Sequence, residues 1–133
     1  MSDRSNVPGQ AWENWKLFFA GRITATSSGA AQTLYTAPSD TDPHTGVKVQ
    51  RIKLQSIRMM NIDTTARRLT LYIVPAGASI SDDYIIMPAC LCPDRTLWHE
   101  VGVDEYIMPG DTVQAYASAT NTIVVRLTGL IRE

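Results

Sequence analysis

Residues 105–133 alternate apolar and polar side chains with a period of two, and this pattern limits the possible folds more than any other feature. In the last run Ile123, Val125, Leu127, Gly129 and Ile131 share one parity. Successive side chains of a β-strand point to opposite faces, so the run predicts a strand with one face in a core. We expect strand, Pro-Gly-Asp turn, strand, polar turn and long strand, joined as hairpins, and we find no catalytic pair in this stretch.

The length and charge of the chain predict one domain and exclude some function classes. The chain has 133 residues and a formal net charge of −1. General nucleic-acid binders carry a strong basic excess, so we expect no nucleic-acid partner. No apolar run reaches the roughly 20 residues that span a bilayer, so we expect no membrane partner. We predict an N-terminal arm at residues 1–15 and a β-sandwich domain at residues 16–133.

Short strand signals recur every eight to twelve residues along the chain. We expect strands at residues 32–37, 47–62, 67–75 and 95–101, and an edge strand or ordered loop at 84–92, which Pro88 interrupts. The parity of the apolar residues slips between Val49 and Ile52 and again between Leu54 and Ile57, which indicates either bulges or a strand that bends between two sheets. We expect residues 47–75 to form a hairpin. Together with residues 105–133 these segments predict an all-β antiparallel sandwich of about eight strands, resembling a jelly roll.

The segment from Trp12 to Phe19 admits two readings. Trp12, Trp15 and Phe19 lie at i, i+3 and i+7, which would align them on one face of a short helix. The alternative is a strand that starts near Lys16. We favour a short helical turn that gives way to a strand.

No combination of residues predicts catalysis, a metal or a cofactor. Cys90 and Cys92 are too far apart in an extended segment for an easy disulfide, whose α-carbons lie within about 6.8 Å. We expect free thiols, as in a reducing cytoplasm. A zinc site at Cys90, Cys92 and His99 lacks the usual spacing and a fourth ligand. The loop carboxylates (Asp40 and Asp42; Asp82 and Asp83) lack the EF-hand pattern for calcium and suit turn capping. We therefore expect a protein that is not an enzyme and uses no cofactor.

Two groups of residues are candidates for partner binding. The first is basic and flanks the expected hairpin at residues 47–75; we expect it to be either a solvated strand face or a contact surface for an acidic partner. It consists of Arg51, Lys53, Arg58, Arg67 and Arg68. The second is the tryptophan pair at the start, which either closes the domain's own core or anchors a neighbouring subunit. The predicted partner-binding residues are Trp12, Trp15, Arg51, Arg58, Arg67 and Arg68.

Three segments resemble small virion proteins of tailed bacteriophages. They are TLYTAPSD, then VKVQRIKLQSIRMMNIDTTARRLTLYIVPAGAS, then YIMPGDTVQAYASATNTIVVRLTGL. The matching positions are residues 33–38, 52–61, 65–77 and 107–118, within a region from 32 to 130. The chain departs from that pattern at residues 12–19, at 39–46 and at the Cys90-x-Cys92 loop.

The resemblance implies a β-sandwich that attaches to the capsid or the tail. Capsid decoration (cement) proteins of that group are jelly rolls of this size that clamp major capsid subunits. The expected function is therefore capsid decoration at the virion surface after synthesis in the host cytoplasm, with the major capsid protein as partner and self-association as a dimer or trimer. The alternatives are a tail, collar or head-fibre component, or a host-surface carbohydrate-binding module with Tyr84, Trp98 and Tyr106 in a groove.

Overall fold

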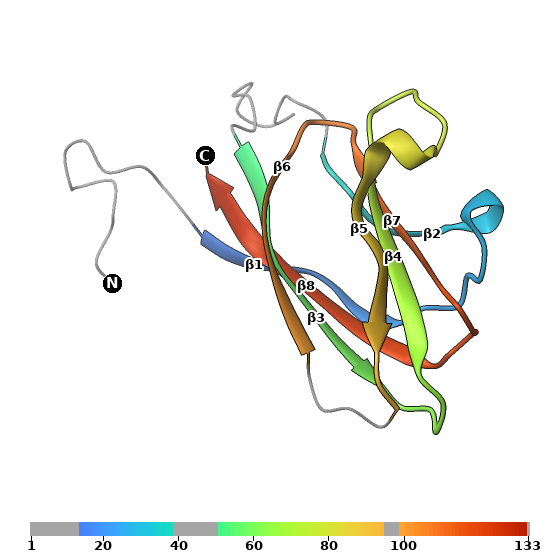
Figure 1. The fold of residues 1–133 in the computed structure, drawn as a ribbon. Coiled ribbons are helices and arrows are strands. Elements are labelled where there is room, and N and C mark those ends of the chain that lie inside the picture. Colours follow the sequence, from blue (N-terminus) through green and yellow to red (C-terminus); the bar gives the residue numbers. More distant parts are fainter. Residues whose placement is uncertain (1–13, 39–50, 95–98, 133) are drawn as a thin grey trace.

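The computed structural model describes residues 14–38, 51–94 and 99–132. They form eight strands in two four-stranded antiparallel sheets (Figure 1), which confirms the predicted sandwich. The strands are β1 (Asn14–Arg22), β2 (Gln32–Thr36), β3 (Arg51–Asn61), β4 (Arg67–Val74), β5 (Ile85–Cys92), β6 (His99–Ile107), β7 (Thr112–Ala117) and β8 (Ile123–Arg132). Two single 3₁₀ turns, η2 (Ser28–Ala30) and η3 (Asp82–Tyr84), precede β2 and β5.

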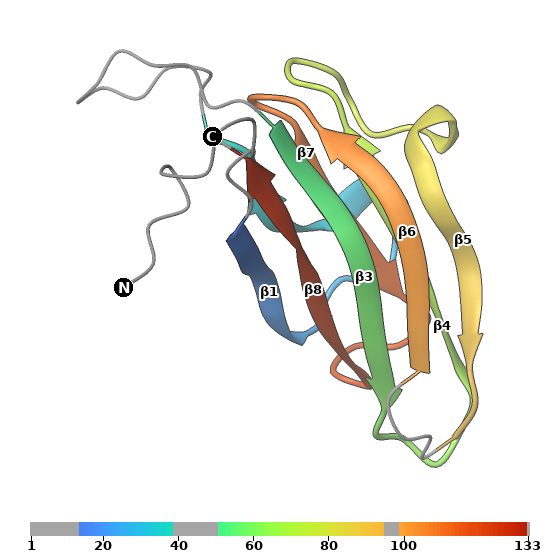
Figure 2. The same ribbon diagram turned by 90° about the vertical axis from the view of Figure 1, so that its left-hand side faces the viewer.

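The two sheets are built from strand pairs that are nested in the sequence. Sheet I has the order β1-β8-β3-β6 and sheet II the order β2-β7-β4-β5. The first strand therefore pairs with the eighth, the second with the seventh, the third with the sixth and the fourth with the fifth. This is the connectivity of a jelly roll. Figure 2 shows sheet I toward the viewer, with sheet II behind it.

The expected hairpins at residues 47–75 and 105–133 are wrong. Strands β3 and β4 belong to different sheets, as do β6 and β7, and β7 and β8. Only β4 and β5 are consecutive strands that pair within the described chain. The connections between the other consecutive strands carry the chain from one sheet to the other. Consecutive strands then pack their apolar faces against each other across the core instead of pairing side by side within one sheet.

The Pro-Gly-Asp turn is one of these crossings, and Asp111 holds it in place. The buried Asp111 carboxylate accepts hydrogen bonds from the Ala76 amide at 3.1 Å and the Met108 amide at 3.0 Å. Gly110 has φ 85°, a conformation that favours glycine, and its amide donates to the Ala37 carbonyl. The turn thus ties the chain after β6 to the ends of β2 and β4.

The parity of apolar residues sets which side of each strand enters the core. In β8 the side chains of Ile123, Val125 and Leu127 are fully buried, whereas Arg126 is exposed. The predicted bulge in β3 is confirmed, because its register with both β6 and β8 shifts between Leu54 and Ser56. An extra residue at that point lets the four buried apolar side chains of β3 face inward despite the slip: Ile52, Leu54, Ile57 and Met59.

The expected helical turn before residue 20 is wrong for the described residues, since β1 is extended from Asn14 to Arg22. The register of β1 with β8 shifts between Leu17 and Phe19, and the bulge turns Phe18 into the core, where its ring lies 4.6 Å from the ring of Tyr35. The extended strand is favoured because it hydrogen-bonds to β8 and buries Phe18, whereas a helix at a sheet edge would leave β8 unpaired on that side.

Gly129 on β8 makes room for this bulge. A Cβ added to Gly129 would lie 2.8 Å from Cε2 of Phe18 and closer still to the carbonyl oxygen of Lys53 on β3. Backbone atoms cannot rotate away, so a side chain here would push β3 and β1 apart. A glycine in the middle of a strand is otherwise unfavourable, and here the close approach of its neighbours explains it.

We therefore expect Gly129→Ala to lower the free energy of unfolding by about 2 kcal/mol or more, as overpacked sites do. Urea unfolding monitored by circular dichroism measures it. Gly102→Ala is the matched control, because no atom lies within 4 Å of a Cβ at Gly102, and we expect a change within about 0.5 kcal/mol. Equal stability of the two variants would contradict the packing argument.

Candidate docking surface

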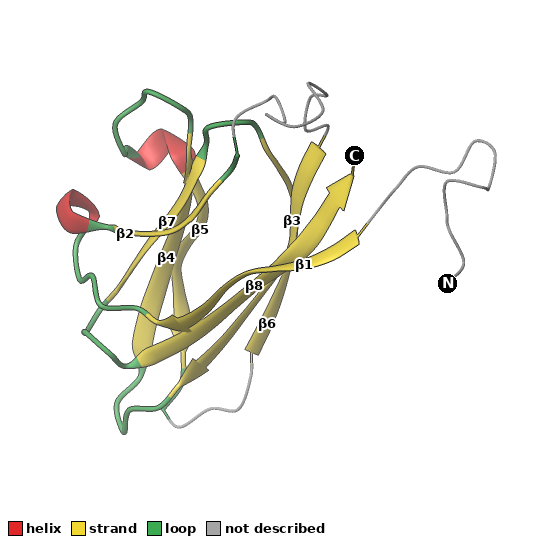
Figure 3. Cartoon of the chain, turned by 180° about the vertical axis from the view of Figure 1, so that it is seen from behind, coloured by secondary structure: helices red, strands yellow, loops and turns green. Residues whose placement is uncertain are grey.

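No described segment covers the outer face of sheet I, which we call the open face, whereas the outer face of sheet II is partly covered. In Figure 2 no described segment crosses in front of β1, β8, β3 and β6. In Figure 3 both 3₁₀ turns lie on the side of sheet II. There η3 packs beside β4, and Tyr72 is buried with its ring 6.2 Å from that of Tyr116. Burial first, and then the hydrogen bond with Tyr116, raises the pKa of Tyr72 to about 12. The open face of sheet I is therefore the candidate docking surface.

An aromatic row crosses one end of this face. The cross-strand register places Trp15 of β1 beside Leu130 of β8, Leu130 beside Lys53 of β3, and Lys53 beside Tyr106 of β6. Trp15 is 72% exposed and Tyr106 is 54% exposed. The Lys53 ammonium lies 5.5 Å from the centre of the Tyr106 ring and forms an ion pair with Asp104. We call these four residues the aromatic row.

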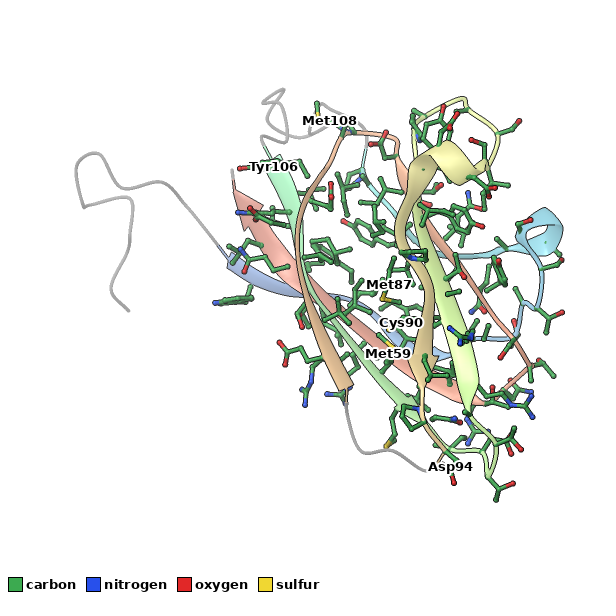
Figure 4. All side chains as sticks on the ribbon, in the orientation of Figure 1. Met59, Met87, Cys90, Asp94, Tyr106 and Met108 are labelled. Atoms are coloured by element: carbon green, nitrogen blue, oxygen red, sulfur yellow. The ribbon has the colours of Figure 1, made fainter. Side chains whose placement is uncertain are left out.

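Other exposed apolar side chains continue the row. Leu17 follows Trp15 on β1 and is exposed, and so is Met108 just after β6. Figure 4 shows Tyr106 and Met108 at the same end of the sandwich, away from Asp94 at the other end. Exposed large apolar residues that gather on one face of a small domain indicate an interaction surface more strongly than scattered ones do.

An arginine row crosses the same face nearer its other end. The register places Ala20 of β1 beside Arg126 of β8, Arg126 beside Arg58 of β3, and Arg58 beside Glu100 of β6. Arg58 Nε lies 3.9 Å from Oε1 of Glu100, whose Oε2 accepts a hydrogen bond from the Ser56 hydroxyl at 3.0 Å. Two arginines opposite each other raise the positive potential locally, which suits an acidic partner.

The predicted basic surface does not form one patch. Arg58 and Trp15 both lie in sheet I, on the open face, but Arg67 and Arg68 begin β4 in sheet II. The cause is the crossing of the chain between β3 and β4. Trp12 lies outside the described residues, and the side chain of Arg51, at the start of β3, is not described either.

Arg67 and Arg68 each have a partner within the chain. Arg67 donates from Nε to Oδ2 of Asp63 at 2.7 Å. That hydrogen bond, together with one from the Thr64 amide, lowers the pKa of the Asp63 carboxyl. Any stabilisation from this pair is therefore present above the usual pKa of an aspartate and is lost as the pH falls through the lowered value. Arg68 donates from Nη1 to the carbonyl of Ala89 at 2.9 Å, which supports the bulge of β5.

Sequence reasoning did not find Leu17, Arg126, Met108 and Leu130 as parts of the surface. The alternation places Arg126 and Leu130 on the outer side of their strand. Only the strand order shows that β8 is flanked by β1 and β3, which brings these residues beside Trp15, Lys53 and Arg58.

The described residues contain no group of three or more potential metal ligands. Asp82 and Asp83 open η3, where the capping group is the Ser81 hydroxyl, which accepts a hydrogen bond from the Asp83 amide. Asp40 and Asp42 and the side chain of His99 lie outside the described residues. The computed structure also has, among the residues it describes, no helix long and apolar enough to cross a membrane.

The two cysteines are free thiols at the end of β5. Cys92 is buried, and its Sγ lies 3.8 Å from the carbonyl oxygen of Cys90. Burial raises the pKa of the Cys92 thiol to about 11. Cys90 is only partly buried. Figure 4 shows Cys90 with Met87 and Met59 between the two sheets.

No protein-family model matches this chain, and neither a curated protein nor a solved structure matches it significantly.

We expect the native protein to show one fast-reacting thiol at pH 8 with a disulfide exchange reagent. A pKa of about 11 for Cys92 leaves roughly one thiol in a thousand as the reactive thiolate at that pH, and its burial slows the reaction further. The second thiol should appear only in denaturant. Cys90→Ser should remove the fast phase; two equally fast thiols in the native protein would contradict the burial of Cys92.

Proposed function

We propose that this protein is a structural component of a tailed-bacteriophage virion, a capsid decoration protein that binds the major capsid protein and stabilises the shell. The observation that carries the proposal is the open face of sheet I, on which both the aromatic row and the arginine row lie across four strands. The resemblance of residues 32–130 to small phage virion proteins supplies the setting. The proposal includes no catalytic step.

The size of the face suits a contact that is repeated many times. Four strands about 4.8 Å apart and eight residues of about 3.3 Å rise give a flat area of about 500 Å². A stable interface buries about 800 Å² on each partner, so this face alone supports a modest affinity. Attachment of many copies to one shell would compensate for this modest affinity. Several contacts between the protein and the capsid must then break before a junction between capsid subunits opens.

The two rows would contribute in different ways. Trp15 and Tyr106 are large, exposed and amphipathic, as are residues that dominate binding energy at interfaces. The arginine row would steer an acidic surface and fix its register, since charge complementarity acts more on specificity and association rate than on affinity. We therefore expect the capsid partner to present an apolar patch beside carboxylates.

Substitutions on β8 test this face at its centre. We expect Leu130→Lys to weaken attachment to protein-free heads at least tenfold, because a charge replaces apolar contact beside Trp15. Arg126→Glu should weaken it at moderate salt while leaving thermal stability unchanged or slightly higher, because the glutamate would face Arg58. Co-sedimentation with heads and a thermal melt give the two measurements.

Leu91→Lys is the matched control, because it makes the same change at an exposed leucine on β5 in sheet II, whereas Leu130 is partly buried. Normal attachment of the Leu130 and Arg126 variants, or equal loss in the Leu91 variant, would count against this face as the capsid contact.

Removing residues 1–13 tests the predicted arm, including Trp12. The truncated chain keeps all of β1, which begins at Asn14, so we expect a folded domain by circular dichroism. Of the two roles expected for the tryptophan pair, anchoring of a neighbouring subunit by Trp12 would weaken co-sedimentation with heads when the arm is removed, and this is the result that we expect. Full attachment of the truncated chain would show that the arm has no anchoring role.

Two other functions fit the same fold and are distinguished by simple measurements. A tail, collar or head-fibre component would occur in six to a few dozen copies per particle, and a decoration protein in hundreds, so a quantitative gel of the virion separates them. A carbohydrate-binding module would bind on a glycan array. Of its candidate residues, Tyr84 ends η3 beside sheet II, Tyr106 lies in sheet I, and Trp98 lies outside the described residues.

A further inference from the structure

The four edge strands of the sandwich differ in how they are protected against pairing with another chain. In sheet II, β2 has only five residues and a register shift, and β5 carries Pro88 and a bulge where Ala89 has φ 31°. In sheet I, β6 carries three carboxylates. Short strands, proline, bulges and charge are the usual protections of sheet edges. Strand β1 has nine residues, no proline and a bulge after Leu17. Before that bulge, residues 14–17 present exposed Trp15 and Leu17, and Lys16 is the one charged residue there.

The two edges of sheet I carry opposite charge. Strand β1 contains Lys16 and Arg22 and no acidic residue, whereas β6 contains Glu100, Asp104 and Glu105 and no lysine or arginine. Pairing of β1 with a second β1 would bring four cations together, and pairing of β6 with a second β6 would bring six carboxylates together. Pairing of β1 with β6 is the combination in which opposite charges meet.

The register within sheet I shows which residues would meet. Lys16 is level with Gly129, Leu54 and Glu105, just as Trp15 is level with Leu130, Lys53 and Tyr106. Strands β1 and β6 run in opposite directions, because three antiparallel pairings separate them. If the next copy continues the sheet at the same level, its β1 adds to β6 in the antiparallel sense. Its Trp15 then lies opposite Tyr106, and its Lys16 lies opposite Glu105.

The two charged residues that would meet in this pairing, Lys16 and Glu105, differ in their contacts from the remaining acidic residues of β6. Asp104 forms an ion pair with Lys53, and Glu100 lies beside Arg58 and Ser56. Lys16 and Glu105 are exposed and have no ion pair or hydrogen bond from their side chains among the described residues. The stretch of β1 before its bulge, residues 14–17, is the part that would pair. At the other end of β1 the Arg22 carbonyl already accepts from the Gln32 side chain.

We propose that this protein associates head to tail with copies of itself, through the β1 edge of one copy and the β6 edge of the next. The contact is heterologous, so it forms a ring where the rotation between copies closes and an open chain where it does not. Backbone hydrogen bonds would supply affinity and the two side-chain pairs would supply register. The inference depends on the edges of sheet I alone and is independent of the virion role.

Charge exchange on the full-length protein tests the contact. Light scattering after size exclusion, and native mass spectrometry, should show assemblies of three or more copies for the unmodified chain. We expect Lys16→Glu and Glu105→Lys each to raise the dissociation constant about tenfold, as an exposed pair turned into a repulsion would. The variant with both changes should recover assembly. A mixture of the two single variants should also recover it, with the two kinds of chain alternating.

Three controls keep the result interpretable. Asp83→Lys changes an exposed carboxylate beside sheet II and should leave assembly unchanged. Trp15→Ala should weaken assembly more than either charge change, about thirtyfold, and thermal melts should show that each variant folds. A monomer or a closed dimer at all concentrations, stronger assembly of Lys16→Glu, or no recovery in the double variant would each overturn the proposal. Because the assay contains no capsid, its failure would leave the test of attachment to heads unaffected.

Discussion

The pairing of β8 with β1 on one side and β3 on the other is the interaction on which the rest of the structure depends. It joins the end of the described chain to its beginning and to its middle. The inward side chains of β8 fill the centre of the core, and Gly129 allows β3 and the Phe18 ring to approach closely. These contacts are far apart in sequence, so the chain must close long loops before they form, which is costly in entropy and slow in jelly rolls generally.

The same pairing creates the surface that we assign to function. With β8 in the middle of sheet I, its outer residues join those of three other strands into the aromatic and arginine rows. Sheet II cannot offer an equal face, because η3 packs beside β4 and Tyr72 is buried there. The strand order also leaves a basic edge and an acidic edge at opposite sides of one sheet. A single topology thus produces both the outer face and the two charged edges on which our two proposals rest.

Prediction from the sequence succeeded where burial acts locally. Most strand positions, the bulge after Leu54 and the edge position of β5 follow from parity and from Pro88, because each depends on which face a side chain presents to the core. The strand expected at residues 95–101 and the one expected to start at residue 105 are wrong as separate elements, because a single strand, β6, runs from His99 to Ile107. Prediction failed in two other places. The spacing of Trp15 and Phe19 predicted a helical turn, but this segment forms a strand because β1 hydrogen-bonds to β8. The turns after β3, β6 and β7 were expected to close hairpins, but they connect strands of different sheets. Of the candidate site residues, Trp15 and Arg58 lie on one face of sheet I. Arg67 and Arg68 begin β4 in sheet II, where Arg67 bonds to Asp63 of the preceding turn and Arg68 to the carbonyl of Ala89 in β5.

The sequence by itself determined that this is a two-layered β protein, which side of most strands is buried, and that its thiols are ill placed for a disulfide. Only the tertiary structure decided which strands are neighbours. Side-chain parity has a period of two in any strand, so it reports the buried face but carries no information about the partner beside it. The two rows on sheet I and the opposite charges at its edges both depend on the order of the strands in that sheet. They became visible when β1 and β8, over one hundred residues apart in sequence, were found side by side.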